Sequence, residues 1–88
     1  MNIMYWLRVV NEDDETKEIF RPTDDGNIPT YEGQDVWLGS GSYQQVESIR
    51  LYPFHSKLPE VTLRIPSLEF DKLALMSEWT EDPPKLDW

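Results

Sequence analysis

The sequence predicts an α+β fold: a mostly antiparallel sheet of four or five strands in a single small domain, with one C-terminal helix packed on it. Three observations support this fold class. The chain has 88 residues, which is enough for one domain. Most of its apolar residues recur with the two-residue period of strands, and a helical period follows a proline near the C-terminus. We expect residues 1–79 to form the domain and residues 80–88 to form an acidic tail.

Two strands with a polar connection are predicted at the N-terminus. Residues 3–10 are rich in β-branched and aromatic side chains and are apolar on both alternating faces, which is typical of a central strand. Residues 11–16 are polar and are expected to connect this strand to a second one at 17–21. Pro22 is expected to end the second strand, because proline cannot donate a hydrogen bond to a sheet. The pair predicts an antiparallel hairpin.

Three more strands are predicted after a long loop. This loop, 22–34, has about 13 residues, and a loop of that length in a small domain is usually functional or mobile. The expected strands are 35–38, 45–52 and 60–65, with a flexible Gly/Ser-rich break between the first two. The third alternates most clearly and should have one buried face and one face in water. The side chains expected in the core are Val61, Leu63 and Ile65, and those expected in water are Glu60, Thr62 and Arg64.

One helix is predicted over 68–79. Pro66 breaks the preceding strand, and Ser67 is a suitable N-cap residue. Glu69 and Asp71 follow it, and acidic side chains suit the positive N-terminal end of a helix dipole.

This helix has two apolar stripes, although a helix lying on a sheet needs only one. The stripes are Phe70, Leu73, Ala74 and Ser77, and Leu68, Leu75, Met76 and Trp79. The second stripe should be covered by the tail or the long loop, or be open to a partner. Trp88 either folds back over this stripe or stays free as a contact residue. Fold-back is favoured, because burying an indole is worth about 2–3 kcal/mol.

The charge is the strongest compositional feature of the chain. Seventeen acidic residues against eight basic ones give a formal net charge of −9 at pH 7. This charge repels nucleic acid and anionic membranes and favours a basic partner. B-DNA carries about one charge per 100 Å² of its cylinder, whereas 17 acids over the ~5,400 Å² expected for this chain give about one per 320 Å². The chain could therefore imitate DNA only if its acids gather on one face.

The sequence carries no pattern for catalysis or for a cofactor. The absence of cysteine excludes a disulfide and a thiolate site. His55, the only histidine, is expected to be an ordinary loop residue, and the acids of "NEDDET" at 11–16 lack the glycine turn of a calcium loop. The segment "GSGS" at 39–42 leads into a strand, unlike a phosphate-binding loop, which opens a helix. We therefore expect no catalytic residue, no metal and no cofactor.

The cytoplasm is the expected location. The first residues, "MNIMYWLRVV", have neither the basic start nor the small-residue cleavage site of a signal peptide. The sequence has no apolar run near the ~20 residues that a helix needs to cross a membrane.

Acidic and aromatic residues in loops are the candidates for a partner-binding site. The acids gather toward both ends of the chain, whereas the middle segment, 36–66, is slightly basic. Tyr31, Trp37, Tyr43 and Tyr52 lie in or next to expected loops, although Trp37 and Tyr52 also suit the core. Arginine stacks on aromatic rings and pairs with carboxylates, so such a surface suits a basic partner. The candidate residues are Glu12, Asp13, Asp14, Glu15, Asp24, Asp25, Tyr31, Glu32, Asp35, Trp37 and Trp88.

These features predict a small acidic non-enzymatic binding protein that inhibits a partner by covering its basic, nucleic-acid-binding surface. In composition the chain resembles small phage-encoded inhibitors, such as anti-CRISPR and anti-restriction proteins, and the immunity proteins of nuclease toxins. The acids could instead serve solubility alone. A different class also fits: an assembly protein that forms homo-oligomers through the second helix stripe. The oligomeric state is left open by the sequence.

Overall fold

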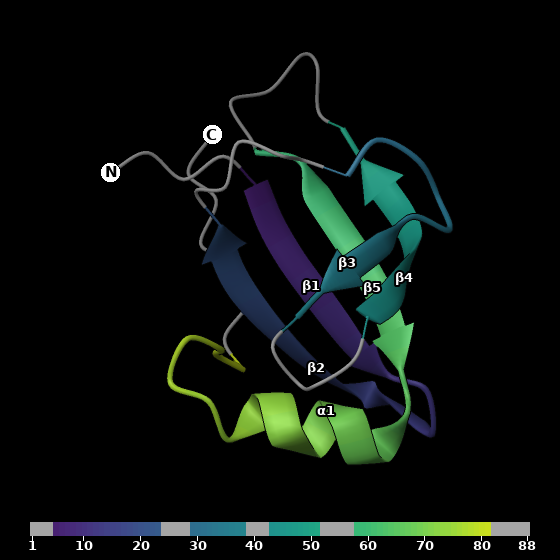
Figure 1. Ribbon diagram of the computed structural model, residues 1–88. Coiled ribbons are helices and arrows are strands. Elements are labelled where there is room, and N and C mark those ends of the chain that lie inside the picture. Colours follow the sequence, from purple (N-terminus) through teal and green to yellow (C-terminus); the bar gives the residue numbers. More distant parts are fainter. Residues whose placement is uncertain (1–4, 24–28, 39–42, 52–57, 82–88) are drawn as a thin grey trace.

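The computed structural model describes residues 5–23, 29–38, 43–51 and 58–81, which form a five-stranded sheet and one helix (Figure 1). This arrangement confirms the predicted α+β class. The elements are β1 (Tyr5–Asn11), β2 (Asp14–Thr23), β3 (Asp35–Trp37), β4 (Tyr43–Arg50), β5 (Glu60–Ile65) and α1 (Ser67–Ala74).

The strand order is β2-β1-β5-β4-β3. Neighbouring strands are antiparallel except β1 and β5, which pair in parallel. β1 is therefore a central strand between β2 and β5, as its two apolar faces predicted. The predicted hairpin of β1 and β2 is also confirmed, since Val9 pairs with Ile19 and Asn11 with Asp14.

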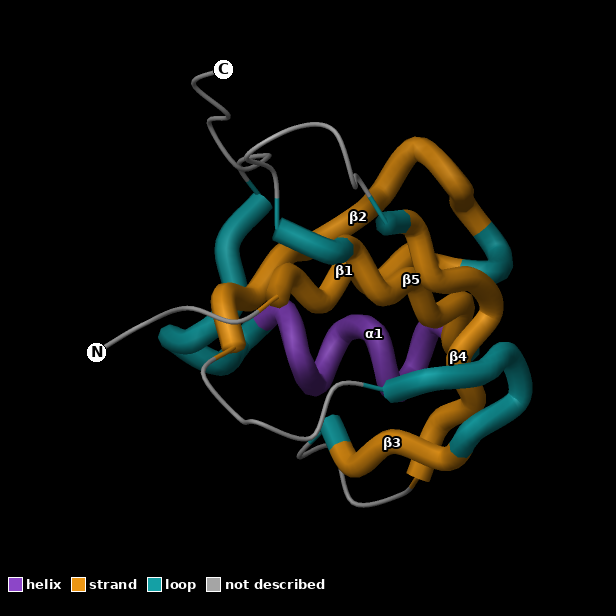
Figure 2. The backbone as a smooth tube through the Cα atoms, turned by 90° about the horizontal axis from the view of Figure 1, so that it is seen from above, coloured by secondary structure: helices purple, strands orange, loops and turns teal. Residues whose placement is uncertain are grey.

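The sheet curls around its core. From above, β2, β1 and β5 lie on one side and β3 lies on the opposite side, with β4 forming the bend and α1 seen between them (Figure 2). In Figure 1, α1 lies across the lower end of the sheet, below β3. One face of the sheet therefore encloses the core, and the other faces outward.

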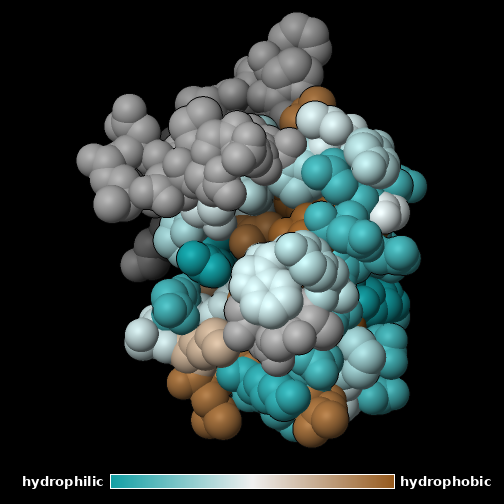
Figure 3. All heavy atoms as spheres, in the orientation of Figure 1, coloured by the Kyte–Doolittle hydropathy of each residue, from teal (hydrophilic) through white to brown (hydrophobic). Residues whose placement is uncertain are grey.

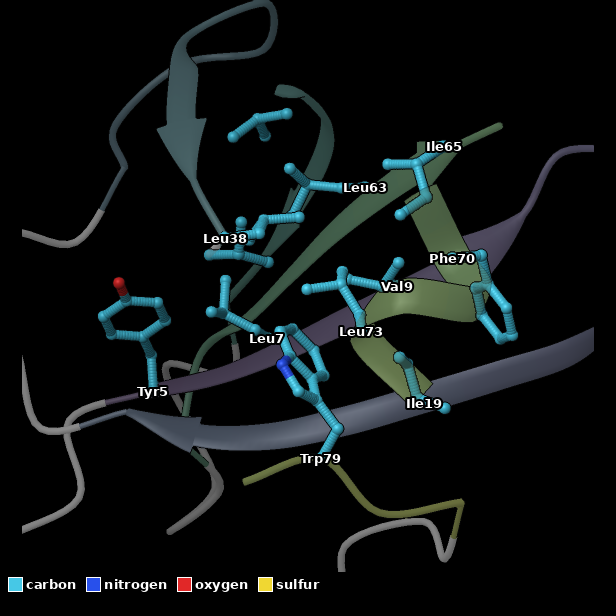
Figure 4. Packing of buried hydrophobic residues seen from close by; sticks show 12 residues of the cluster. Tyr5, Leu7, Val9, Ile19, Leu38, Leu63, Ile65, Phe70, Leu73 and Trp79 are labelled. Carbon is cyan, nitrogen blue, oxygen red and sulfur yellow. The ribbon is translucent and has the colours of Figure 1, made fainter. Parts of the chain in front are cut away.

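The core is built from alternate residues of the strands and from the inner side of α1 (Figure 4). Val61, Leu63 and Ile65 of β5 are fully buried, as their alternation predicted. Thr62, which was expected in water, is also buried, because β5 is an inner strand of the sheet. The buried cluster consists of Tyr5, Leu7, Val9, Ile19, Leu38, Val46, Val61, Leu63, Ile65, Phe70, Leu73 and Trp79.

β2 is longer than predicted and runs through Pro22. The expected connection 11–16 shrinks to a two-residue turn, because Asp14 already pairs with Asn11. β2 lies at the edge of the sheet, and the Phe20 N–H points outward to the carbonyl of Thr80 at 2.7 Å. Two residues further along, the nitrogen of Pro22 lies on the same outward side, facing away from β1. Its missing N–H therefore removes no hydrogen bond between β2 and β1. The prediction that Pro22 ends this strand was therefore wrong.

α1 is shorter than predicted, and Ser67 is not its N-cap. Pro66 occupies the N-cap position without a side-chain cap, and the Ser67 hydroxyl lies 2.9 Å from Asn11 Oδ1 and 2.6 Å from Asp13 Oδ2. The helix ends at Ala74, so the prediction that Trp79 forms its last turn was wrong. Trp79 enters the core beyond the helix end, and Thr80 then pairs with Phe20.

The two helix stripes are only partly confirmed. Phe70 and Leu73 are buried, whereas Ala74 and Ser77 of the same stripe are exposed. Leu68 and Leu75 of the second stripe are 68% and 89% exposed.

The boundaries of β3 and β4 also shift from the predicted ones. β3 ends at Trp37 instead of residue 38, and Leu38 is buried in the core. β4 begins at Tyr43, two residues earlier than expected, and ends at Arg50. Predictions for residues 3–4, 24–28, 39–42, 52–57 and 82–88 lie outside the described residues, and these include His55 and Trp88.

Gly33 is the described position where the backbone needs glycine. Its φ is +86°, a left-handed conformation, and apart from its two chain neighbours no residue comes within 4 Å of the place that a Cβ would take. Its N–H donates to the Val46 carbonyl at 2.8 Å, next to the bond from Val46 N–H to Gln34 O. Gly33 therefore sets how the chain enters β3.

Replacing Gly33 by alanine should lower the free energy of unfolding by about 1–2 kcal/mol, the cost of a left-handed conformation for a residue with a Cβ. Because nothing crowds the site, asparagine, which tolerates this conformation better, should cost less. Urea denaturation of both variants measures the difference. Equal losses for alanine and asparagine would show that the backbone conformation is not the cause.

Candidate protein-binding surface

The first group of predicted site residues, Glu12, Asp13, Asp14 and Glu15, forms an acidic turn between β1 and β2. Three of these acids are already engaged within the fold. Asp13 accepts a hydrogen bond from Ser67, Asp14 accepts from both the N–H and the hydroxyl of Thr16, and Glu15 pairs with Arg64. The acidic turn therefore has a structural role, because its side chains connect it to the start of α1 and to β5.

The hydrogen bonds from Thr16 hold the pKa of Asp14 below its usual range. The Thr16 hydroxyl, 2.6 Å from Oδ1, has the largest effect, the Thr16 N–H adds to it, and Lys17 contributes a smaller attraction. Because the folded pKa is lowered, the carboxylate stabilises the fold above its unfolded pKa of about 3.9. This stabilisation is lost as the pH falls through the lowered value.

We expect Thr16→Ala to raise the pKa of Asp14 toward its ordinary value, because the larger of the two hydrogen bonds disappears. The stability lost between pH 6 and pH 3 should then be smaller than in the wild type. Carbon NMR titration of the Asp14 carboxyl and denaturation at both pH values measure the two effects. Thr16→Ser keeps the hydroxyl and is the matched control. A pKa that is equal in all three proteins would contradict this assignment.

Arg64 separates the acidic turn from the acids of β4. Its guanidinium pairs with Glu15 and also lies 3.1 Å from Glu47 on β4. On the same outer face, Arg8 pairs with Glu18 at 2.7 Å. The outer face of the sheet therefore alternates in charge, and among the described residues it is not an unbroken array of acids.

A second group of residues forms an exposed aromatic patch on β3 and β4. Val36 packs against the core, so its neighbours Asp35 and Trp37 point outward. Trp37 is 53% exposed and Tyr43, its cross-strand partner, is 66% exposed. Their rings meet in a T-shaped contact with centroids 5.2 Å apart and an angle of 60°. Figure 3 shows large pale side chains in the middle of this face, with hydrophilic residues to their right.

Tyr31 and Glu32 extend this patch along the chain. Both are exposed in the turn that leads into β3, and Tyr31 is 61% exposed. The turn is held by the Thr30 N–H, which donates to Gln34 Oε1 at 2.9 Å, and by the Gly33 bond to Val46. We use the name aromatic patch for Tyr31, Glu32, Asp35, Trp37 and Tyr43.

The structure thus divides the predicted site. Asp35 and Trp37 lie on the same face of β3, Tyr31 and Glu32 are exposed in the turn that precedes it, and the acidic turn lies apart from them, beyond Arg64. Asp24, Asp25 and Trp88 lie outside the described residues. Tyr43 was noted as a loop-side aromatic but not included among the candidates. The register between β3 and β4, in which Asp35 faces Gln45 and Trp37 faces Tyr43, is what brings it into the aromatic patch.

Neither a metal-binding cluster nor a membrane-spanning helix is found among the described residues. Within residues 5–23, 29–38, 43–51 and 58–81, no group of three or more histidine or acidic side chains is placed to hold a metal ion. No helix among these residues is long and apolar enough to cross a membrane.

No protein-family model, curated protein or solved structure matches the chain.

Proposed function

We propose that this protein is a non-enzymatic inhibitor that uses the aromatic patch to cover a basic surface on another protein. The observation that carries the proposal is the exposed Trp37–Tyr43 pair beside Asp35, in a chain with a net charge of −9. Tryptophan and tyrosine are enriched among the residues that dominate binding energy at protein interfaces. An arginine of the partner could stack on either ring and pair with the Asp35 carboxylate.

The proposed target is a nucleic-acid-binding surface, because such surfaces are lined with lysine and arginine. The net charge would steer the protein onto such a surface and keep it away from nucleic acid itself. The alternating charges around Arg64 argue for recognition by a local contact of aromatic rings and carboxylates, not for imitation of a regular DNA backbone.

Affinity capture tests this function. The immobilised protein should retain a partner from a bacterial lysate at about 0.1 M NaCl and release it at about 1 M, where charges are screened within about 3 Å. The captured partner should bind nucleic acid, and free inhibitor should displace that nucleic acid. A column carrying Trp37→Ala should retain less partner. Capture that is insensitive to salt, or a partner that keeps its nucleic acid in the presence of inhibitor, would refute the proposal.

A second candidate function, homo-oligomeric assembly, is favoured by one observation. Leu68 and Leu75 are highly exposed and lie seven residues apart, so they share one side of α1 and its C-terminal end. This candidate ranks second, because a stable interface buries about 800 Å² per partner, more than two leucine side chains supply, and two copies with a charge of −9 repel each other. Sedimentation decides between them: a symmetric dimer that Leu75→Glu converts to a monomer supports assembly.

A further inference from the structure

The groove between β2 and α1 is a feature that neither the aromatic patch nor the acidic turn uses. Its volume is about 440 Å³, which lies within the range of about 300–1,000 Å³ typical of small-molecule sites. Three segments meet around it: the first half of β2, the side of α1 that carries Phe70, Asp71 and Ala74, and the chain that follows the helix. The lining residues are Thr16, Lys17, Glu18, Ile19, Phe70, Asp71, Ala74 and Glu81.

The groove has an apolar base. Ile19 and Phe70 both line it and are themselves almost completely buried, and Figure 4 shows them close together at one side of the core. Ala74 adds a methyl group from the next turn of α1. Because Ile19 and Phe70 are already buried, an aliphatic stem would add only a small apolar contact here, chiefly with the exposed methyl group of Ala74.

The charged side chains at the rim of the groove determine which charge a ligand should carry. Glu18 is neutralised by Arg8 at 2.7 Å on the outer face of the sheet. Asp71 and Glu81 have no ion pair with any described residue, and Lys17 is the one base that lines the groove among these residues. The rim therefore carries a net negative charge and attracts a positively charged group.

The position of Glu81 is set by the fold and not by the helix. The Thr80 N–H donates to the Phe20 carbonyl at 2.9 Å, and the Phe20 N–H donates to the Thr80 carbonyl at 2.7 Å. This two-bond bridge ties the chain after α1 to the edge of β2, so the next residue, Glu81, is held beside the groove. The carboxylates of Asp71 and Glu81 thus come from separate segments, and both segments are anchored to rigid elements.

We propose that this groove binds a lysine side chain of the basic partner, with its methylene stem against Ala74 and its ammonium group between Asp71 and Glu81. Lysine fits better than arginine, because a compact ammonium with three donors can serve two separate carboxylates, whereas the planar guanidinium pairs best with one. The inference rests on the proposed function for the identity of the partner. The groove would be a second contact, distinct from the aromatic patch.

Titration of the full-length ¹⁵N-labelled protein with Nα-acetyl-lysine N-methylamide tests the groove without the partner. The amides of Thr16–Ile19 and Phe70–Ala74 should shift with half-saturation at about 1 mM, the range expected for so small a ligand. The norleucine analogue, which has the stem without the charge, should bind more weakly, and so should the arginine analogue. Absence of shifts in these two segments, or equal binding of norleucine, would overturn the inference.

Charge variants make the test specific. Asp71→Asn combined with Glu81→Gln should weaken lysine binding about threefold to thirtyfold, because each exposed carboxylate contributes only a modest ion pair to the ligand. Lys17→Gln should strengthen binding by about twofold, because it removes a repulsive charge. Glu78→Gln is the matched control, since Glu78 is exposed nearby in sequence but does not line the groove. If Glu78→Gln weakens lysine binding equally, the effect comes from the net charge of the protein and not from the groove, and the proposal is overturned.

The two proposals can fail separately. If lysine does not bind the groove but Trp37→Ala still weakens partner binding, the groove inference falls and the proposed function stands. If Trp37→Ala and salt leave partner binding intact, the proposed function falls, whatever the titration of the groove shows.

Discussion

Replacing Leu73 by alanine should lower the free energy of unfolding by about 2–5 kcal/mol, the range of a truncated core leucine. Leu73 is completely buried and, with Phe70, attaches α1 to the inner face of the sheet. The truncation would leave a cavity between two layers that can close only if the helix moves. Since domains of this size are stable by about 5–15 kcal/mol, the loss should be a large share of the total.

Leu68→Ala is the matched control for this prediction. It makes the same change in the same helix, but Leu68 is 68% exposed, so its cost should stay within about 0.5 kcal/mol. Guanidinium denaturation followed by far-UV circular dichroism measures both variants. Similar losses for the two leucines would show that α1 does not pack on the sheet as described.

Replacing Trp37 by alanine should weaken binding of the captured partner by about 2 kcal/mol or more, roughly thirtyfold. Trp37 presents an exposed ring at the centre of the aromatic patch, next to Asp35 and in contact with Tyr43. Its removal takes away both the stacking surface for an arginine and the ring that orients Tyr43. Calorimetric titration with the purified partner measures the change.

The stability of Trp37→Ala should fall by no more than about 1.5 kcal/mol, the range of one aromatic pair. Leu75→Ala is the binding control, because it removes an even more exposed apolar side chain, 89% against 53%, outside the aromatic patch. If Leu75→Ala weakens binding as much as Trp37→Ala does, the partner contacts α1 and the aromatic patch is not the interface.

Asp35→Asn should weaken binding of the partner less than Trp37→Ala does, and it should reduce the salt dependence of that binding.

The candidate site was predictable in part. The sequence indicated Tyr31, Glu32, Asp35 and Trp37 from their positions in and beside a long loop. The structure places Asp35 and Trp37 in the edge strand β3, and Tyr31 and Glu32 in the exposed turn before it. It did not indicate that Trp37 meets Tyr43, because that contact depends on the register between β3 and β4. Nor did it indicate that Glu15 has a partner, since that partner, Arg64, lies 49 residues away.

By itself, the sequence determined the α+β class, the central position of β1, the inward face of β5 and the strong negative charge. These properties depend on local periodicity and composition, which need no knowledge of distant segments. The tertiary structure decided the rest: the passage of β2 through Pro22, the burial of Trp79, the pairing of Thr80 with Phe20 and the groove beside it. Each of these depends on which segments meet at the edge of the sheet, where hydrogen-bonding needs and solvent access differ from those of an inner strand.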